Sequence, residues 1–261
     1  MFNKFREHIQ KYWKYSFFSA KTQLKAEVAN SYLNWLWWII DPLSFMLIYT
    51  FIFGYVFHSA EPYFPLFIFI GLTMWEFFNK NLTQSVKLVK NKKSVISKVY
   101  IPKYILLLIK IYVNAFKFGI SLIITVIMLF AFKVPVTYRV IYAVPIFLIL
   151  GLISFGIGCF LLHFGVFVED LSNVVKIVLR ILFYLTGIFW NIQERLPAPY
   201  GSLVCKLNPV AFLLTSMREC TLYSTTPDLG LMAIWFLVGI IISALGIRLI
   251  YKYENSYVKL I

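Results

Sequence analysis

The sequence predicts an all-α integral membrane protein with six transmembrane helices, an N-terminal interfacial helix, and short re-entrant helices between the fifth and sixth spans. Apolar residues make up 61% of the chain and charged residues 14%, whereas a soluble domain is roughly half apolar and about a quarter charged. The apolar residues fall into blocks close to the roughly 20 residues that a helix needs to cross the hydrocarbon core. Alternating segments of about ten residues, typical of transmembrane β-barrels, are absent from the sequence.

Residues 1–34 are predicted to form a cytoplasmic amphipathic segment that lies in the membrane interface. Between Phe5 and Leu33, lysines are interspersed with Tyr, Trp and Phe. This composition favours a helix whose rings lie at headgroup depth and whose lysines face anionic lipid. The stretch lacks a short apolar core followed by a small-residue cleavage site, so it is not predicted to be a cleaved secretory signal.

Residues 35–261 are predicted to form one domain that contains the six spans. The apolar blocks have the approximate bounds 35–57, 64–78, 104–132, 140–168, 174–190 and 229–251. The first block is interrupted only by Asp41-Pro42, and the short second block reaches spanning length if it extends to Leu88. A basic, amphipathic segment follows it over residues 86–98.

Small residues four positions apart occur in two of the blocks. Ser154 and Gly158 lie in the fourth block, and Gly239 and Ser243 lie in the sixth. Because small residues let two helix backbones approach closely, both pairs predict helix packing. Cys159 lies in the same apolar block as the first pair and is also predicted to pack in the core.

The loop over residues 191–228 does not have the composition of a simple connector. It contains short apolar runs separated by four prolines, namely Pro197, Pro199, Pro209 and Pro227. The runs are too short to span and suit short helices that dip into the outer leaflet, where other protein surrounds their backbone. Cys205 and Cys220 share this loop, and their spacing alone leaves a disulfide between them open.

The distribution of basic residues predicts the orientation. Of the 25 Lys and Arg residues, six precede Ser31 and seven lie from Lys80 to Lys103, while the loops after the first, third and fifth blocks are much poorer in them. The positive-inside rule therefore predicts that the N-terminus and, after six spans, the C-terminus are cytoplasmic. The same rule accounts for the net charge of +14 without nucleic acid as a partner.

Catalytic and cofactor motifs are missing from the sequence. It contains no phosphate-binding loop, no H-E-x-x-H pair and no G-x-S-x-G turn. His8, His58 and His163 are too far apart to suggest a ligand set, so neither a metal site nor a cofactor is predicted in this chain. Asp41 and Glu76 lie inside or beside different spans and make a weak candidate for an intramembrane enzyme.

Polar residues recur along one face of the third block. Lys103, Lys110 and Lys117 are seven residues apart, and Asn114 lies near the same helix face. A cation at mid-bilayer costs about 2.5–3.5 kcal/mol, so it usually faces protein or water. Two interpretations stay open: the helix protrudes and its lower lysines snorkel, or Lys110, Asn114 and Lys117 line a water-accessible path for an anionic passenger.

The fifth block carries two cations one turn apart near its start, Lys176 and Arg180, and ends at Trp190. Snorkelling is the simpler explanation of the two cations, because the span is short and its basic end is predicted to be cytoplasmic. The alternative places Lys176, Arg180 and Trp190 on the same path as the polar face of the third block. High aromatic content, 19% of the chain, fits interfacial belts and also stacking on sugar rings.

Four groups of residues, taken in chain order, resemble permease subunits of type-2 ABC exporters, in particular those that move O-antigen, capsule or teichoic acid. They are Leu24-Lys25 with the Trp37-x-x-x-x-Pro42-Leu43 stretch; residues 71–78 with Lys90-Asn91 and residues 98–103; Glu169-Asp170; and residues 207–210 with Arg218. The chain departs from the family where Arg-Asp is common, at Glu169-Asp170. It also has Glu27-Val28 where Arg-Tyr is common, and Leu33-Asn34 where Leu-Gly is common.

The resemblance implies a multi-pass permease of the bacterial inner or plasma membrane that acts as a homodimer with two separate ATPase subunits. ATP and Mg would be bound by those subunits, in keeping with the missing phosphate loop. Cytoplasmic contacts with the ATPase would fall to Lys25, Lys92, Lys93, Lys98, Glu169 and Asp170. The channel would lie at the dimer axis, lined by spans that include the first and fifth, with re-entrant helices at its outer end.

The function implied is ATP-driven export of a polyprenyl-linked glycan from the cytoplasmic to the outer face of the membrane. A type-2 exporter of small lipids or drugs is one alternative and predicts a narrow, uniformly apolar lumen. An intramembrane enzyme that acts on lipid-linked sugars is the other, and it predicts turnover by the chain without an ATPase.

Overall fold

The structure, a computed structural model, describes residues 2–29, 33, 35–58, 61–197 and 199–260. Within these ranges all regular elements are helices and no strand occurs. Ser31 and Asn34, part of the connection that was predicted to lead from the interfacial helix into the first span, lie outside the described residues.

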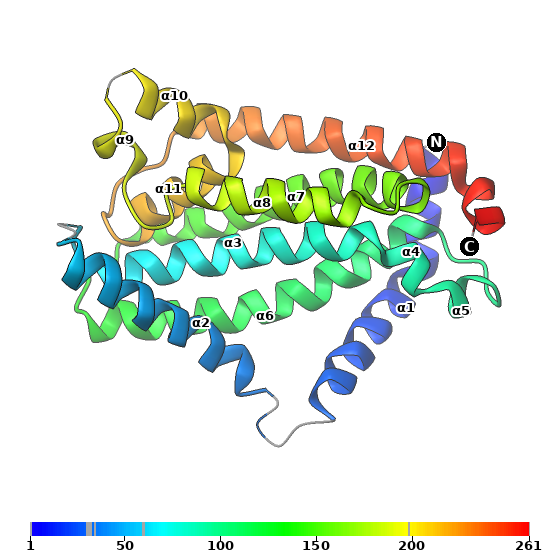
Figure 1. Ribbon diagram of the computed structural model, residues 1–261, viewed down its shortest axis with the longest axis horizontal. Helices are drawn as coiled ribbons and strands as arrows, with labels where there is room; N and C mark the ends of the chain where they lie inside the picture. The colour runs from blue at the N-terminus through cyan, green and yellow to red at the C-terminus, as the bar shows by residue number, and fades with distance from the viewer. Residues whose placement is uncertain (1, 30–32, 34, 59–60, 198, 261) are drawn as a thin grey trace.

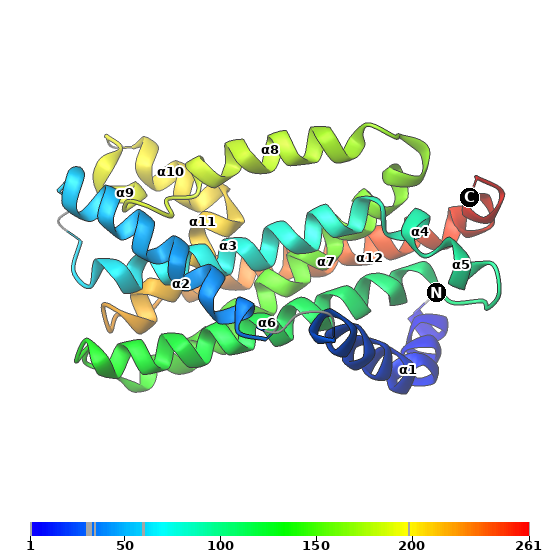
Figure 2. The same ribbon diagram turned by 60° about the horizontal axis from the view of Figure 1, so that its bottom comes forward.

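Long helices run side by side along the long axis of the molecule (Figures 1 and 2). They are α3 (Phe64–Val86), α6 (Lys103–Ala131), α7 (Ala143–Phe167) and α12 (Leu229–Leu260). α7 packs on both α3 and α12, and the small residues predicted to pack lie at these contacts. A Cβ on Gly239 would lie 3.0 Å from a side-chain carbon of Leu152, and the Ser243 hydroxyl donates to the Leu152 carbonyl at 3.1 Å.

α3 is enclosed on several sides, because it contacts α2 (Trp37–Tyr49), α6, α7, α8 (Leu171–Leu185) and α11 (Pro209–Thr221). Of its 23 residues, 16 are buried. This enclosure explains how α3 carries Asn81 and Ser85, both fully buried, inside an otherwise apolar bundle.

Four helical stretches of the described chain are long and apolar enough to cross a membrane: Trp37–Val56, Lys103–Ala131, Tyr138–Phe167 and Leu229–Glu254. They match the first, third, fourth and sixth predicted blocks. The first combines α2 with the π-helical η1 (Thr50–Val56), and the fourth begins with the 3₁₀ turn η2 (Tyr138–Tyr142). The second and fifth blocks correspond to α3 and α8.

α8 is shorter than the predicted fifth block, which was placed at 174–190. It ends at Leu185, because the chain turns at Gly187, whose φ is +70°. Trp190 therefore belongs to the following turn and not to the helix.

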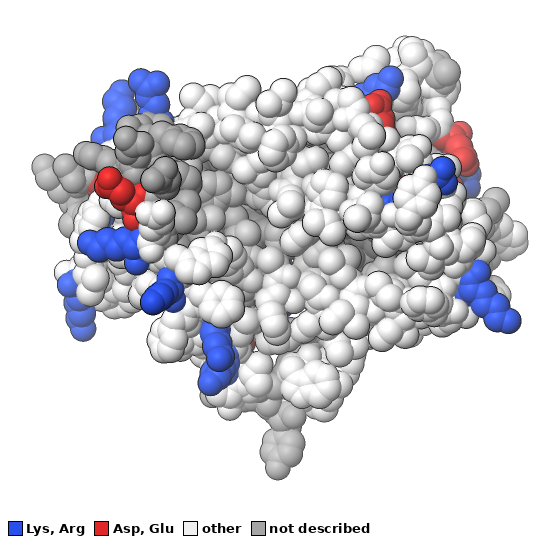
Figure 3. All heavy atoms as spheres, turned by 180° about the vertical axis from the view of Figure 1, so that it is seen from behind, with Lys and Arg blue, Asp and Glu red and all other residues white. Residues whose placement is uncertain are grey.

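The beginning of α1 (Phe2–Val28) and the end of α12 lie at the same end of the molecule, with α4 (Leu88–Asn91) and α5 (Lys93–Ile96). The other end holds α9 (Ile192–Arg195), α10 (Tyr200–Leu207) and α11 (Figure 1). Viewed from behind, charged side chains gather toward the two ends, and a broad band between them is uncharged (Figure 3). Cys159, Cys205 and Cys220 are buried and free.

Candidate functional site

The polar face of α6 points into the protein. Lys103 is 2% exposed, and its ammonium donates to a Glu254 carboxylate oxygen on α12 at 3.4 Å. The Lys117 ammonium lies 2.5 Å from a Glu27 carboxylate oxygen on α1 and 5.4 Å from the ring centre of Trp38. Each of these two cations is therefore held by a carboxylate from another helix.

Asn114 joins α6 to α3. Its amide nitrogen donates to Asn81 Oδ1 at 2.7 Å and to Gln84 Oε1 at 3.2 Å, and the side chain is 3% exposed. Lys110 is half-buried on the same face and, among the described side chains, forms none of the ion pairs.

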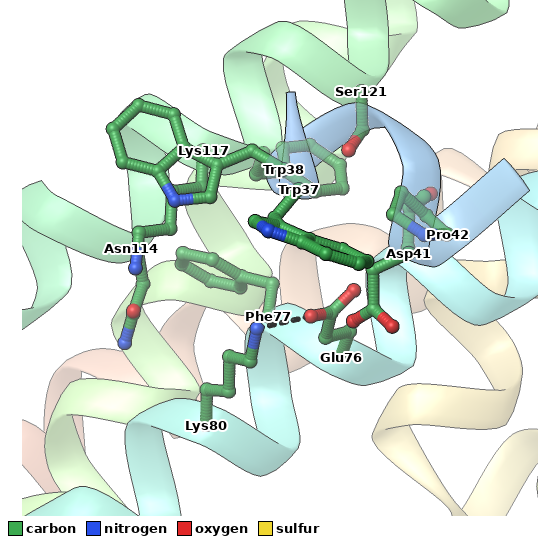
Figure 4. Close-up of a pocket in the computed structure, with 12 residues that line it drawn as sticks. Trp37, Trp38, Asp41, Pro42, Glu76, Phe77, Lys80, Asn114, Lys117 and Ser121 are labelled. Atoms are coloured by element: carbon green, nitrogen blue, oxygen red, sulfur yellow. Dashed lines mark hydrogen bonds and ion pairs between the residues drawn. The ribbon is translucent and has the colours of Figure 1, made fainter. Parts of the chain in front are cut away.

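A polar cavity of about 380 Å³ lies beside this face, between α2, α3 and α6 (Figure 4). Asn114 and Lys117 line it from α6, and Trp37, Trp38 and Asp41 line it from α2. The polar lining residues are Asp41, Thr73, Glu76, Lys80, Asn114, Lys117 and Ser121. The cavity is therefore a polar compartment within the bundle.

Asp41 and Glu76, which the sequence left on separate helices, face this one cavity (Figure 4). The Lys80 ammonium forms an ion pair with a Glu76 oxygen one turn along α3. Sequence reasoning missed Lys80, Glu27 and Glu254 as the partners of Glu76, Lys117 and Lys103. A signal for Lys80 was available in its spacing of four residues from Glu76; none marked Glu27 or Glu254.

A second groove lies on the other side of α3, against α8. It has a volume of about 490 Å³ and is lined from α3 by Trp75, Asn79 and Thr83. Its α8 wall consists of Lys176, Leu179, Arg180, Phe183 and Tyr184. Lys176 and Arg180 are exposed and form no ion pair with any described residue.

α8 itself is covered on one side only. Of its 15 residues, just Ser172, Val175 and Leu179 are buried. Lys176, Arg180 and Tyr184 follow one another at intervals of four and share one helix face. The single chain thus leaves a face open that carries a tyrosine and two cations without a carboxylate partner among the described residues.

Aromatic rings continue from this groove toward the end of the molecule that holds α9 to α11. Phe189 stacks on Phe53 with ring centres 4.6 Å apart and lies 4.7 Å from the Tyr49 ring and 5.2 Å from the Phe183 ring. Trp190 follows and lines a cavity of about 360 Å³ with Phe53 and Phe57. The structure therefore brings Lys176, Arg180 and Trp190 to one side of α3 and leaves Lys110, Asn114 and Lys117 on the other (Figure 2).

Arg218 fixes the helices at this end. Its buried guanidinium donates to the carbonyls of Phe67 at 3.0 Å, Gly187 at 2.8 Å and Ile188 at 2.9 Å. Three carbonyl acceptors satisfy a buried guanidinium without a carboxylate. Arg218 thereby ties α11 to α3 and to the turn that leads out of α8.

Two of the segments predicted to contact an ATPase are neighbours. Glu169, which is 91% exposed, lies 3.9 Å from the ammonium of Lys90 in α4, and Asp170 directly precedes α8. Lys92 and Lys93 lie in the same α4–α5 segment, and Lys98 lies in the turn that follows α5. Lys25 is separate from this group, because it lies on α1 and lines a groove against α6.

Comparison with known proteins identifies the family to which the chain belongs. The profile of the ABC-2 type transporter family matches residues 17–222. The O-antigen export system permease protein RfbA of Klebsiella pneumoniae is 24% identical over 239 residues, which cover 91% of each chain. A protein of the same name from Myxococcus xanthus is 25% identical over 80% of each chain.

A third relative is the polysialic acid transport protein KpsM of Escherichia coli. It is 23% identical over 220 residues, which cover 77% of this chain and 78% of that protein. The family match begins within α1 and covers α3, α6, α7, α8 and α11 completely. The chain is therefore a member of the ABC-2 type transporter family.

Proposed function

We propose that this chain is the permease subunit of an ATP-driven ABC exporter that moves a lipid-linked polysaccharide from the cytoplasmic to the outer face of a bacterial plasma membrane. Two of the relatives are named for O-antigen export and one for polysialic acid transport. ATP and Mg belong to a separate ATPase subunit, since the chain carries no phosphate-binding loop. O-antigen, capsule and teichoic acid are the candidate cargoes.

The observation that carries this proposal is the open face of α8. A 15-residue helix is about 22 Å long at 1.5 Å per residue, shorter than the roughly 30 Å of hydrocarbon. Two unpaired cations on such a helix are unfavourable against lipid and favourable against water. We infer that this face lines a water-filled path, and that a second copy of the chain supplies the opposite wall.

The same inference completes the topology. α3 and α8 add two membrane crossings to the four apolar spans, which gives six, with both ends of the chain cytoplasmic. α10 and α11 then form the re-entrant helices at the outer mouth, where Arg218 holds α11. The basic α4–α5 segment and Glu169-Asp170 lie at the cytoplasmic end and are the proposed ATPase contacts, together with Lys25.

The lining of the α8 groove favours a glycan over a small apolar drug. The exposed ring of Tyr184 offers a stacking surface in the groove, and Trp190 offers another in the neighbouring cavity. The amide of Asn79 and the hydroxyl of Thr83 offer hydrogen bonds to sugar hydroxyls. A drug exporter is expected to have a uniformly apolar lumen instead. We also propose a second site that attracts the anionic headgroup of the cargo. It consists of Lys110, Asn114 and Lys117.

The direct test reconstitutes the chain with its ATPase partner in proteoliposomes and measures ATP-driven movement of a polyprenyl-pyrophosphate-linked glycan. We expect transport that requires both subunits, and ATPase activity that glycan lipids stimulate more than small amphiphiles do. Stimulation by small amphiphiles alone would favour a drug or lipid exporter. Turnover of lipid-linked sugar by the purified chain without the ATPase would favour an intramembrane enzyme.

A further inference from the structure

An apolar groove of about 750 Å³ runs between α1 and α6, on the side of the molecule away from α8. α1 and α2 diverge from their connection, and α6 runs across the open side between them (Figure 1). The groove wall comes from all three helices: its largest side chains are Trp13, Phe17 and Leu24 of α1, Trp38 of α2, and Tyr112 and Phe116 of α6.

The wall of this groove is unlike that of the cavity in Figure 4, although Trp38 lines both. Two carboxylates, two ammonium groups and an amide line the cavity, which is a place for water or a polar group. The groove has neither acids nor amides among its described lining residues. Because α6 crosses the membrane, apolar wall at its flank is covered by hydrocarbon chains more favourably than by water.

Two cations lie on the α1 side of the groove. Lys21 and Lys25 are one helical turn apart, both are exposed, and both line the groove. Glu27, the nearest acid along α1, is already engaged by Lys117 at 2.5 Å. The charge at this site is therefore uncompensated and positive, which complements an anionic headgroup beside an apolar tail.

We propose that the groove between α1 and α6 is a binding site for a bilayer phospholipid with an anionic headgroup. One acyl chain lies against Phe17, Leu24 and Phe116, and the phosphate lies between the ammonium groups of Lys21 and Lys25. A bulk phospholipid fits this site better than the glycan carrier, because the groove wall offers a sugar no amide or carboxylate partner. The bound lipid then fixes the angle between the interfacial helix α1 and α6.

The test is native mass spectrometry of the full-length chain in non-ionic detergent with equal amounts of phosphatidylglycerol and phosphatidylcholine. We expect one phosphatidylglycerol retained per chain, in about tenfold preference to phosphatidylcholine. The double variant Lys21→Gln/Lys25→Gln should lose that preference. Lys11→Gln/Lys14→Gln is the matched control, because it removes two exposed charges of the same helix outside the groove, and it should keep the preference.

Two results would overturn the proposal: equal retention of the two lipids by the unaltered chain, or an equal loss of the preference in both double variants. Each variant should also elute from gel filtration as a monodisperse peak. This control shows that a loss of bound lipid does not result from unfolding. Because the readout is bound lipid in the absence of ATP and cargo, it is independent of whether the chain exports polysaccharide.

Discussion

The two basic helix faces on either side of α3, those of α6 and α8, differ in what their cations contact. On α6, Lys103 and Lys117 each reach a carboxylate of another helix, and Asn114 is bonded to α3. On α8, Lys176 and Arg180 reach none among the described residues. Cations thus form ion pairs within the chain on one side of α3 and have no carboxylate partner among the described residues on the other.

The comparison predicts that changes to the buried contacts of α6 reduce stability and that changes on α8 reduce transport. The largest expected effect is that of Glu254→Gln, which leaves the buried Lys103 ammonium without its partner. Removing one member of a buried ion pair costs about 3–5 kcal/mol, and thermal unfolding in detergent measures the loss. Glu169→Gln is the control, since its pair with Lys90 is exposed and its loss should leave unfolding unchanged. Equal effects of the two substitutions would contradict the structural role of the Lys103–Glu254 pair.

Asn114→Leu is the next largest change. It deprives Asn81 and Gln84 of their donor, and a buried polar group left without a partner costs about 1–3 kcal/mol. The same unfolding assay applies, with Asn173→Leu on the exposed side of α8 as the control. If the two variants unfold alike, the contact between α3 and α6 does not depend on this amide.

The double variant Lys176→Gln/Arg180→Gln should fold normally and fail in transport. Loss of two charges that attract an anionic head is expected to lower the rate of ATP-driven glycan export about tenfold, measured in proteoliposomes at matched protein content. Lys252→Gln, an exposed cation of α12, controls for loss of charge alone. Full export by the double variant would place the path elsewhere.

Lys110→Gln/Lys117→Gln has the smallest expected effect. The Lys117–Glu27 pair is partly exposed, so its loss costs little stability, and export should fall less than about fivefold. Undiminished export with normal expression removes both lysines from the path. A decrease as large as that of the α8 variant would instead make α6 the main route and reverse the comparison.

Much of the bundle could be predicted from the sequence, because block length and the seven-residue spacing on α6 depend on neighbouring residues only. The residue that each lysine contacts could not be predicted from the sequence. Lys103 and Glu254 are 151 residues apart, and Lys117 and Glu27 are 90 apart, so no local pattern indicates either pair. The end of α8 at Leu185 was also missed: apolar residues continue to Trp190, and the break at Gly187 depends on a backbone angle that hydropathy does not report.

Neither α3 nor α8 is among the four described stretches that are long and apolar enough to cross a membrane. Both depart from a lipid-like helix, but for different reasons. α3 carries polar residues in its second half and is surrounded by protein, whereas α8 is short and carries its cations on an open face. α8, with 15 residues, is therefore left out because of its length, whereas α3, with 23 residues, is left out because of its polar second half.

The central claim is that the open face of α8 is in contact with water inside the membrane. Thiol labelling of Arg180→Cys in intact membranes with a membrane-impermeant maleimide tests it most directly, because all three native cysteines are buried and free. Ile123→Cys on α6, whose native side chain is 63% exposed on an apolar face, is the matched lipid-facing position. We predict rapid labelling at position 180 and none at position 123; protection of position 180 to the same degree as position 123 would contradict the account.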